Sequence, residues 1–474
     1  MSTSGPTVQL PTDVQAVNLG LPLFATALGD QAIPVQQVDW RIPAGGDLGA
    51  VEALVALYGG SESSTGIEVA NAEVFRRLDQ GVPFLVDVAR AADVVPGLAD
   101  RVLLHSGPAI SWERVCDPLR RSMRAAVVAE GWAAQVAEAD RLLAGGDIRL
   151  EPANEHSTVV PMATSIGPSA PVFVVDNEAG GTRGFAPVNQ GPGNVAWFGR
   201  DTDEAIARLV FLREVAGPTL RRMVHDNGPI DVFALAAQGV QMGDDLHMRT
   251  QATTNLLIRN LLPYLPGPDR PGGRAFAEYL SGNHLFFLNI AMAAAKSLTL
   301  WAEQVRGSSI VTTMARNGTD FGCKLAGDDT WYLTAAPPVG DALYYSGYGP
   351  QTAALDIGDS AVLELIGLGG PAAAGSPAVA AFLGGSMDDA ARATKEMIDV
   401  CVGASSRFKI PVFGFRGTPV GVDVRKVVET GITPKVNTGV LHLDAGVGQI
   451  GAGVATAPMA CFTEALVSLR SRLG

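Results

Sequence analysis

The residues best suited to chemistry lie between Met242 and Arg249, in the sequence Met-Gly-Asp-Asp-Leu-His-Met-Arg. Two carboxylates, an imidazole and a guanidinium so close together can move protons and bind an anion. An apolar run from Leu256 to Leu262 follows, so we expect the segment to open a helix that this run anchors in a core. Free backbone N–H groups at such a helix start favour a negatively charged ligand.

Helical spacing predicts which of these side chains are neighbours. Residues three or four positions apart share one helix face, so we expect Asp244 near His247 and Asp245 near Arg249. A capped helix with one ion pair on its solvent side would use the same residue types. The segment alone does not separate a ligand site from that simpler structure.

Two further polar loops carry candidate binding residues. His156 lies between a carboxylate and two hydroxyls, where it could act as a base or bind a substrate, with an ordinary loop histidine as the alternative. Thr182 and Arg183 belong to a glycine-rich loop after a strand-like run at 172–175, and a second amide-rich loop follows at 189–194. Backbone amides in such loops approach an oxyanion, and arginine binds a carboxylate or phosphate at two points.

The C-terminal half contains three more candidates. Asn317 offers both a donor and an acceptor, which suits an amide or a ureide, but its Asn-Gly pair is also the commonest hairpin turn. Asn437 and His442 precede a GxGxxG pattern that begins at Gly446. This pattern is too near the C-terminus for a dinucleotide-binding βαβ unit, so we interpret it as a loop at a ligand or subunit contact. His442 could equally be a core histidine.

The composition excludes several classes of partner. The chain has 474 residues and a net charge of −13, which argues against binding to nucleic acid or to an anionic membrane. Its four cysteines are scattered without a CxxC pair, so neither a disulfide framework nor a zinc site is expected. We expect reduced cysteines in a cytoplasmic protein that uses no metal and no cofactor.

Motifs and apolar runs narrow the possibilities further. The sequence has no GxSxG, GxxxxGK[ST] or HExxH motif, although a convergent site needs none. We expect no signal peptide, because residues 1–11 are polar and lack a basic region and an apolar core. The apolar run 285–295 is shorter than the roughly 20 residues of a membrane span and contains Asn289, so it predicts a buried helix.

The order of expected elements predicts a multidomain protein of mixed α/β and α+β class. Strands at 14–19 and 35–39 with a helix at 21–28 are typical of a Rossmann-like crossover, and we expect such a domain over 1–146. Asp39 lies where a ribose-binding acid would, but the first turn lacks GxGxxG, so no dinucleotide function is expected. The remaining elements of this domain are strands at 84–88 and 101–104 and helices at 66–78 and 110–143.

The rest of the chain divides into a helical insert and α+β parts with glycine-rich loops. We expect residues 201–300 to be mainly helical. Residues 147–200 together with 301–474 are expected to form two α+β domains. Their predicted elements are strands at 172–175, 310–314, 361–366 and 440–443, and helices at 387–402 and 457–472.

Five segments together resemble one family. They are 18–24 (Asn-Leu-Gly-Leu-Pro-Leu-Phe), 38–44 (Val-Asp-Trp-Arg-Ile-Pro-Ala), 242–249, 282–284 (Gly-Asn-His) and 431–434 (Gly-Ile-Thr-Pro). Their order and spacing are similar to those of the YlbE-like family, also called AllG, over nearly the whole chain. That family usually has Met-Gly-Asp-Glu-x-His-x-Arg at the third segment, so Asp245 stands here in place of a longer glutamate.

The resemblance implies a fold and an activity. The implied fold is a Rossmann-like N-terminal domain, two α+β domains and a helical insert. The implied activity is oxamate carbamoyltransferase, which splits oxalurate with phosphate into oxamate and carbamoyl phosphate during allantoin breakdown. The implied partners are an FdrA-like subunit and a third small subunit, with a homodimer of this chain inside the hetero-oligomer.

That reaction implies roles for the candidate residues. It needs cationic groups that bind phosphate and a carboxylate, hydrogen-bond donors for an oxyanion and an acid for the departing amide. In this interpretation Arg183 and Arg249 bind the anions, Asn317 and Asn437 hold the ureide, and His247, oriented by Asp244, donates the proton. The full set of expected catalytic residues is His247, Asp244 and Asp245, and that of substrate-binding residues is Arg249, Arg183, Thr182, Asn317, Asn437, His156 and His442.

Two alternatives stay open. The same kind of complex could act on another ureide or a cyclic amide. The chain could instead be a non-catalytic scaffold for an FdrA-like subunit, with its glycine-rich, apolar C-terminal region as the interface. Clustering of His247, Arg249, Arg183 and Asn317 in one cleft would favour an enzyme, and their dispersal would favour the scaffold.

Overall fold

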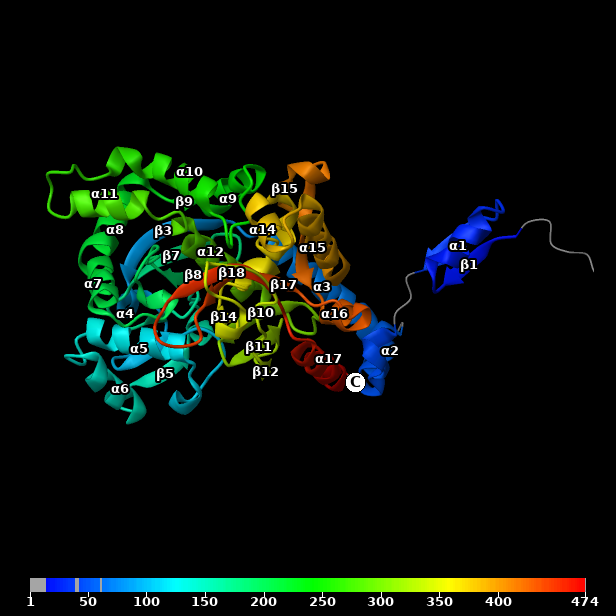
Figure 1. Ribbon diagram of the computed structural model, residues 1–474, viewed down its shortest axis with the longest axis horizontal. Coiled ribbons are helices and arrows are strands. Elements are labelled where there is room, and N and C mark those ends of the chain that lie inside the picture. Colours follow the sequence, from blue (N-terminus) through cyan, green and yellow to red (C-terminus); the bar gives the residue numbers. More distant parts are fainter. Residues whose placement is uncertain (1–13, 39–41, 60–61, 474) are drawn as a thin grey trace, which may run out of the picture.

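The structure is a computed structural model that describes residues 14–38, 42–59 and 62–473. Figure 1 shows a broad body in which helices surround several small sheets, with a short N-terminal unit at one end. The segment 39–41, which holds the acid expected at a ribose-binding position, lies outside the described residues.

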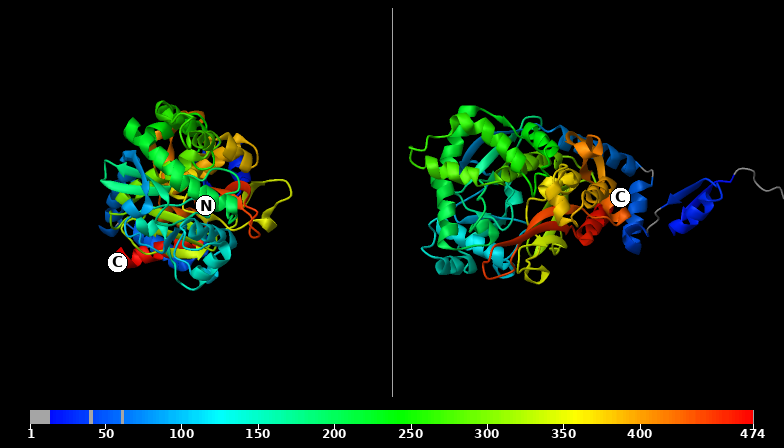
Figure 2. Two further views of the ribbon diagram at one scale, coloured as in Figure 1. Left: turned by 90° about the vertical axis from the view of Figure 1, so that its left-hand side faces the viewer. Right: turned by 45° about the horizontal axis from the view of Figure 1, so that its top comes forward.

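The N-terminal unit consists of β1 (Ala16–Leu19), α1 (Pro22–Gly29) and β2 (Val35–Val38). Its two strands pair in parallel, which confirms the expected strand–helix–strand order. The unit stands clear of the body (Figures 1 and 2), and α1 buries none of its residues. Within the described residues these two strands join no larger sheet.

The centre of the body is a buried helix packed on an antiparallel sheet. α12 (Phe286–Ala302) is apolar on nearly all sides, and a helix of this kind needs a core around it. The strands of its sheet, in spatial order, are β8 (Thr182–Pro187), β7 (Pro171–Asn177), β3 (Pro83–Arg90) and β9 (Ile230–Asp231). Gly184 permits the close packing, because a Cβ there would lie 2.2 Å from the carbonyl oxygen of Ala293. The predicted buried helix is confirmed.

A smaller sheet and two helices lie beside this layer. β4 (Val102–His105) pairs in parallel with β5 (Arg149–Pro152) and antiparallel with β6 (Ser165–Ile166). The helix expected over 110–143 is two helices, α5 (Asp117–Ala129) and α6 (Val136–Ala144). The chain turns between them at Gly131, whose φ is 75°.

Helices dominate the part between 201 and 300, as expected. Before α12 they are α7 (Asp203–Phe211), α8 (Gly217–Asn227), α9 (Val232–Gln241), α10 (Gln251–Leu261) and α11 (Gly273–Ser281). No single described helix is long and apolar enough to cross a membrane; α11 and α12 together reach the length but are bent by 78°.

The C-terminal part contains two small antiparallel sheets and a hairpin. Their strands are β10 (Val311–Asn317), β11 (Asp320–Leu325), β12 (Tyr332–Ala335) and β14 (Ile357–Gly358) in one sheet, β13 (Asp341–Tyr344), β17 (Lys435–Leu441) and β18 (Gln449–Thr456) in the other, and β15 (Cys401–Ile410) with β16 (Arg416–Val422) in the hairpin. The helices that pack around them are α13 (Val362–Leu365), α14 (Pro377–Phe382), α15 (Met387–Val400), α16 (Val424–Thr430) and α17 (Met459–Leu473), together with α2 (Leu48–Tyr58) and α3 (Glu62–Gln80) from the N-terminal side.

The fold is therefore a mixed α/β multidomain architecture, as predicted. The specific Rossmann-like domain over 1–146 is not confirmed, because its strands belong to several separate sheets. Of the strands expected further along, 361–366 is wrong: the chain there forms the short helix α13. The division into three parts stays a prediction.

Candidate functional site

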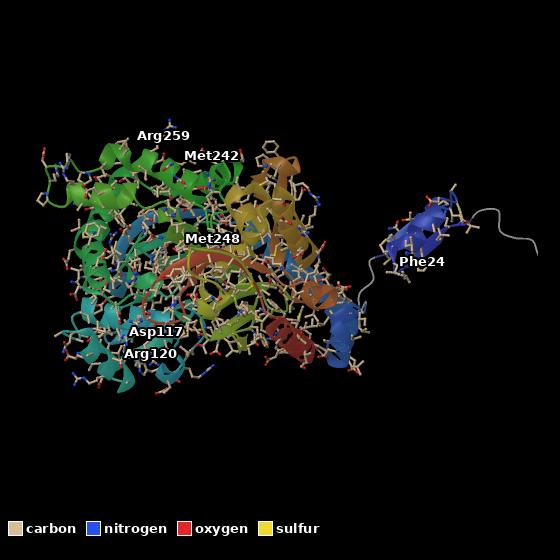
Figure 3. All side chains as sticks on the ribbon, in the orientation of Figure 1. Phe24, Asp117, Arg120, Met242, Met248 and Arg259 are labelled. Atoms are coloured by element: carbon tan, nitrogen blue, oxygen red, sulfur yellow. The ribbon has the colours of Figure 1, made fainter. Side chains whose placement is uncertain are left out.

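The segment Met242–Arg249 is a loop between two helices and does not open a helix. α9 ends at Gln241 and α10 begins only at Gln251. Gly243 and Leu246 have φ of 97° and 65°, and a helix cannot continue through this left-handed backbone. Figure 3 shows Met242 at the outer surface and Met248 towards the middle of the body. The loop therefore leads from the surface to the interior.

Asp244 fixes the start of α10 from within this loop. Its buried carboxylate accepts hydrogen bonds from the backbone N–H of Thr253 (2.7 Å) and Ala252 (3.2 Å) and from the Thr253 hydroxyl (2.8 Å). The Arg249 guanidinium donates to the same carboxylate at 2.9 Å. Burial nevertheless raises the pKa of Asp244. Asp244 therefore pairs with Arg249 and not, as expected, with His247. Because Arg249 forms this ion pair, its charge is not free to bind a ligand.

His247 is held by a carboxylate that the sequence did not single out. Its Nδ1 lies 2.7 Å from Oε1 of Glu364, and both side chains are buried, with 3% and 0% exposed. The same oxygen accepts from the backbone N–H of Gly370 and Asn437. Only glycine fits at position 369, because a Cβ there would lie 2.0 Å from that oxygen. A carboxylate on Nδ1 fixes the tautomer and leaves Nε2 to exchange protons.

Asp245 connects this pair to Asn437. One oxygen of Asp245 accepts from the Asn437 side chain at 2.7 Å, and the other accepts from the backbone N–H of Arg249 at 2.7 Å. The Oδ1 atom of Asn437 is buried and makes no hydrogen bond with the described residues. We call Asp245, His247, Glu364 and Asn437 the histidine cluster. Three of its four members were predicted from the sequence.

A cavity of about 800 Å³ begins one residue beyond the cluster, at Met248. We call it the central cavity. It forms where the loop 192–200, the start of α12, the end of α14 and the strands β13 and β18 come together. Clefts between separate parts of a chain are common places for small-molecule sites, and this volume is typical of them.

The wall of the central cavity contains one permanent cation and no acid among the described residues that line it. The cation is Arg200, and partial desolvation lowers the pKa of the other basic group, His284. Three polar atoms of this wall are buried without a hydrogen-bond partner in the described chain: Arg200 Nε, Asn194 Oδ1 and Tyr344 OH. Such atoms are rare in folded proteins. The wall can therefore accept an anion with further polar groups.

Arg183 and Thr182 lie elsewhere, in the wall of a second cavity. This cavity measures about 660 Å³, and we call it the Arg183 cavity. Arg183 donates two hydrogen bonds to Asp176, of 2.5 and 2.8 Å, and Thr182 donates to the carbonyl of Ser297. In the described part of the chain, neither residue forms a hydrogen bond or an ion pair with the histidine cluster.

The remaining candidates have structural partners. Both ring nitrogens of His156 are engaged, by the Pro96 carbonyl at 2.8 Å and by Glu151 at 2.7 Å. Asn317 is buried and shapes its hairpin turn, accepting from the N–H of Thr319 and Asp320. His442 lies 2.7 Å from the Asp444 carbonyl. For His156 and Asn317 the geometry matches the simpler alternatives. His442 is only partly buried, with 13% of its side chain exposed, so it is not a core histidine and its role stays a prediction.

Sequence reasoning missed Glu364, Arg200 and Tyr344. The sequence could have pointed to Glu364, because it is a lone acid inside the apolar run 361–366. A buried acid there is costly without a partner. Arg200 and Tyr344 gave no such signal. Within the described residues no group of three His, Cys, Asp or Glu side chains could hold a metal ion.

A solved structure shares this fold. It is a conserved protein of unknown function from Enterococcus faecalis V583, with a TM-score of 0.85 and 34% sequence identity, over 88% of this chain and all of that one. The fold therefore places the chain among multidomain α/β proteins that have a known structural representative.

Sequence comparisons identify the family. The family profile described as "Oxamate carbamoyltransferase subunit AllG" matches residues 148–360. The Escherichia coli K12 protein of that name is 36% identical over 416 residues, which are 86% of this chain and 99% of that protein. The uncharacterized protein YahG of the same organism is 34% identical over 464 residues, 97% of this chain and 98% of its own. The chain belongs to the AllG family.

Proposed function

We propose that this chain is a subunit of a carbamoyltransferase that splits a ureido acid with phosphate. The specific reaction is oxalurate plus phosphate giving oxamate and carbamoyl phosphate, in purine and allantoin catabolism. The family relationship supports the transferase class. We further propose that the chain works in a complex with an FdrA-like subunit and a third small subunit, as a homodimer within it.

The observation that carries the proposal is the buried His247–Glu364 pair, whose neighbour in the sequence, Met248, lines the central cavity. A phosphate oxygen attacks the terminal carbamoyl carbon of the ureido group, and the carbon–nitrogen bond to the oxamate part then breaks. The departing nitrogen takes a proton from Nε2 of His247 and leaves as the oxamate amide. Phosphate returns its own proton to His247, so the enzyme ends the cycle unchanged. Glu364 stabilises the charged imidazole during the transfer.

Asp245 and Asn437 position the reactants in this scheme. Asp245 holds the amide of Asn437, so that the free Oδ1 of Asn437 can accept an N–H of the ureide. That match is chemical: a ureide offers several N–H groups, and a buried amide oxygen needs one.

The proposal is tested with His247→Gln in the assembled complex. Glutamine keeps a polar side chain but cannot exchange a proton, so carbamoyl phosphate formation should fall by about 100-fold or more while the variant stays folded. Met242→Gln is the control, because it lies in the same loop but is 56% exposed at the surface. Undiminished turnover by His247→Gln would exclude this mechanism.

A non-catalytic scaffold is the second candidate. It is favoured by the separation of Arg183 and Asn317 from His247, since the expected four-residue cluster does not form. In that case the His247→Gln complex keeps full activity, whereas variants of the partner subunit lose it.

A further inference from the structure

We propose that Arg200 binds the carboxylate of the ligand in the central cavity, so that this site selects an acid over a neutral ureide or cyclic amide. The inference rests on the proposed function only in taking the central cavity as the substrate site. It replaces Arg183 and Arg249 as the anion grip, because both of those are paired with aspartates.

Arg200 is the available positive charge of this region. The adjacent acid in the sequence, Asp201, is engaged at both oxygens: Arg121 lies 3.2 Å from one and Arg124 lies 2.8 Å from the other. Arg200 itself has no carboxylate within 4.0 Å among the described residues, although it is half-buried. Its Nε is buried without a hydrogen-bond partner in the described chain, and an anion in the cavity would supply that partner.

Two more groups of the wall define the ligand. Burial raises the pKa of Tyr344, so its phenol stays protonated and is a second donor for a carboxylate. Asn194 uses its Nδ2 on Glu204, at 2.9 Å, which leaves Oδ1 as an acceptor. Two donors and one acceptor match a small molecule with a carboxylate and a nearby N–H group.

This pattern separates an amide acid from phosphate. Phosphate at neutral pH carries up to two negative charges, so the field of Glu204, which accepts from Asn194, disfavours it more than a singly charged carboxylate. Oxamate offers both a carboxylate and an amide N–H, and a ureido acid offers the same two groups. The class assigned to the site is therefore a small carboxylate with an amide or ureide nitrogen.

The test is a calorimetric titration of the full chain with oxamate, its neutral isostere oxamide and inorganic phosphate. We expect wild type to prefer oxamate to oxamide, and Arg200→Gln to weaken oxamate binding about 10- to 100-fold. Oxamide and phosphate should bind Arg200→Gln as they bind wild type. The matched control is Arg259→Gln, which removes the same charge from an exposed surface position (Figure 3).

Three results would overturn the inference: equal binding of oxamate and oxamide, no binding of oxamate by wild type, or an Arg200→Gln variant that binds oxamate normally. These results are separable from the fate of the proposed function. Turnover lost in His247→Gln with oxamate binding intact in Arg200→Gln would leave the function standing and this inference refuted. Conversely, the wild-type complex could make no carbamoyl phosphate while Arg200→Gln loses oxamate binding. That result would refute the proposed function and support this inference.

Discussion

The central cavity and the Arg183 cavity each have one arginine among the described residues of their walls. The central cavity measures about 800 Å³ and the Arg183 cavity about 660 Å³. Arg183 is paired with Asp176 and lies beside a second acid, Glu178, so that wall is net acidic. Arg200 faces no acid among the residues that line its cavity. The two cavities therefore differ in available charge far more than in size.

The chain geometry explains the difference. Asp176 and Arg183 are directly opposite each other on β7 and β8, where oppositely charged side chains pair. Arg200 follows Gly199, whose φ of 75° turns the chain, and the neighbouring Asp201 is engaged by other arginines. Both arginines lie close to glycines, so that setting does not distinguish them. What decides whether each can bind a ligand is whether a carboxylate of the chain already pairs with it.

The largest expected effect comes from comparing an acid-to-amide change in the histidine cluster with the same change in the wall of the Arg183 cavity. Glu364→Gln should lower kcat about 10- to 100-fold, because the amide cannot stabilise a charged imidazole at His247. The measurement is steady-state carbamoyl phosphate formation by the complex. KM should change little, since Glu364 acts through His247 and not on the substrate.

The control is Glu178→Gln, the same change in the wall of the Arg183 cavity, where the side chain is exposed. We expect its kcat to equal that of wild type. Equal losses in both variants would mean that the histidine cluster has no special role beside the central cavity.

A smaller effect is expected from two glycines with left-handed backbone. Gly448 has φ of 98°, and a Cβ there would lie 3.1 Å from Nε of Arg200. Gly181 in the Arg183 cavity has φ of 63° and open space around it. Alanine costs backbone strain at both positions, about 1 kcal/mol. Only Gly448→Ala should also displace Arg200, weakening oxamate binding roughly three- to tenfold.

Calorimetric titration with oxamate checks this pair, and thermal unfolding shows whether the two variants lose similar stability. Unchanged oxamate affinity in Gly448→Ala would show that the loop at Ala445–Gly448 does not shape the Arg200 site.

Much of the secondary structure could be predicted from the sequence. Periodicity and apolar runs predicted α12, the helices of 201–300 and most strands, because these depend on local pattern. The apolar run at 361–366 was mistaken for a strand, since a short buried run fits a strand or a helix equally well. The loop at Met242–Arg249 was mistaken for a helix start because the left-handed backbone at Leu246 has no sequence signal.

The site was predicted in part for the same reason. His247, Asp245 and Asn437 stood out as polar residues in unusual settings, and the structure brings them together. The link between them is Glu364, 117 residues away from His247 in the chain. Pairing at that distance depends on how the helical and C-terminal parts pack, which no local pattern contains. At Arg183 the error was to predict a free anion-binding residue. Asp176 lies seven positions earlier and could have been identified as its partner across a hairpin.

The smallest expected effect comes from a substitution that frees the arginine of the Arg183 cavity, so that its wall resembles that of the central cavity. Asp176→Asn removes the partner of Arg183, and the guanidinium, half exposed, becomes free. We expect weak binding of inorganic phosphate at the Arg183 cavity, with a Kd on the order of millimolar, because solvent and salt screen an exposed charge. Phosphorus NMR of the full chain would detect it as line broadening that Arg183→Gln in the same variant abolishes. Carbamoyl phosphate formation should stay within about twofold of wild type, since this cavity lies apart from the histidine cluster. A large loss of activity in Asp176→Asn would instead place the Arg183 cavity in the reaction and remove the distinction between the two sites.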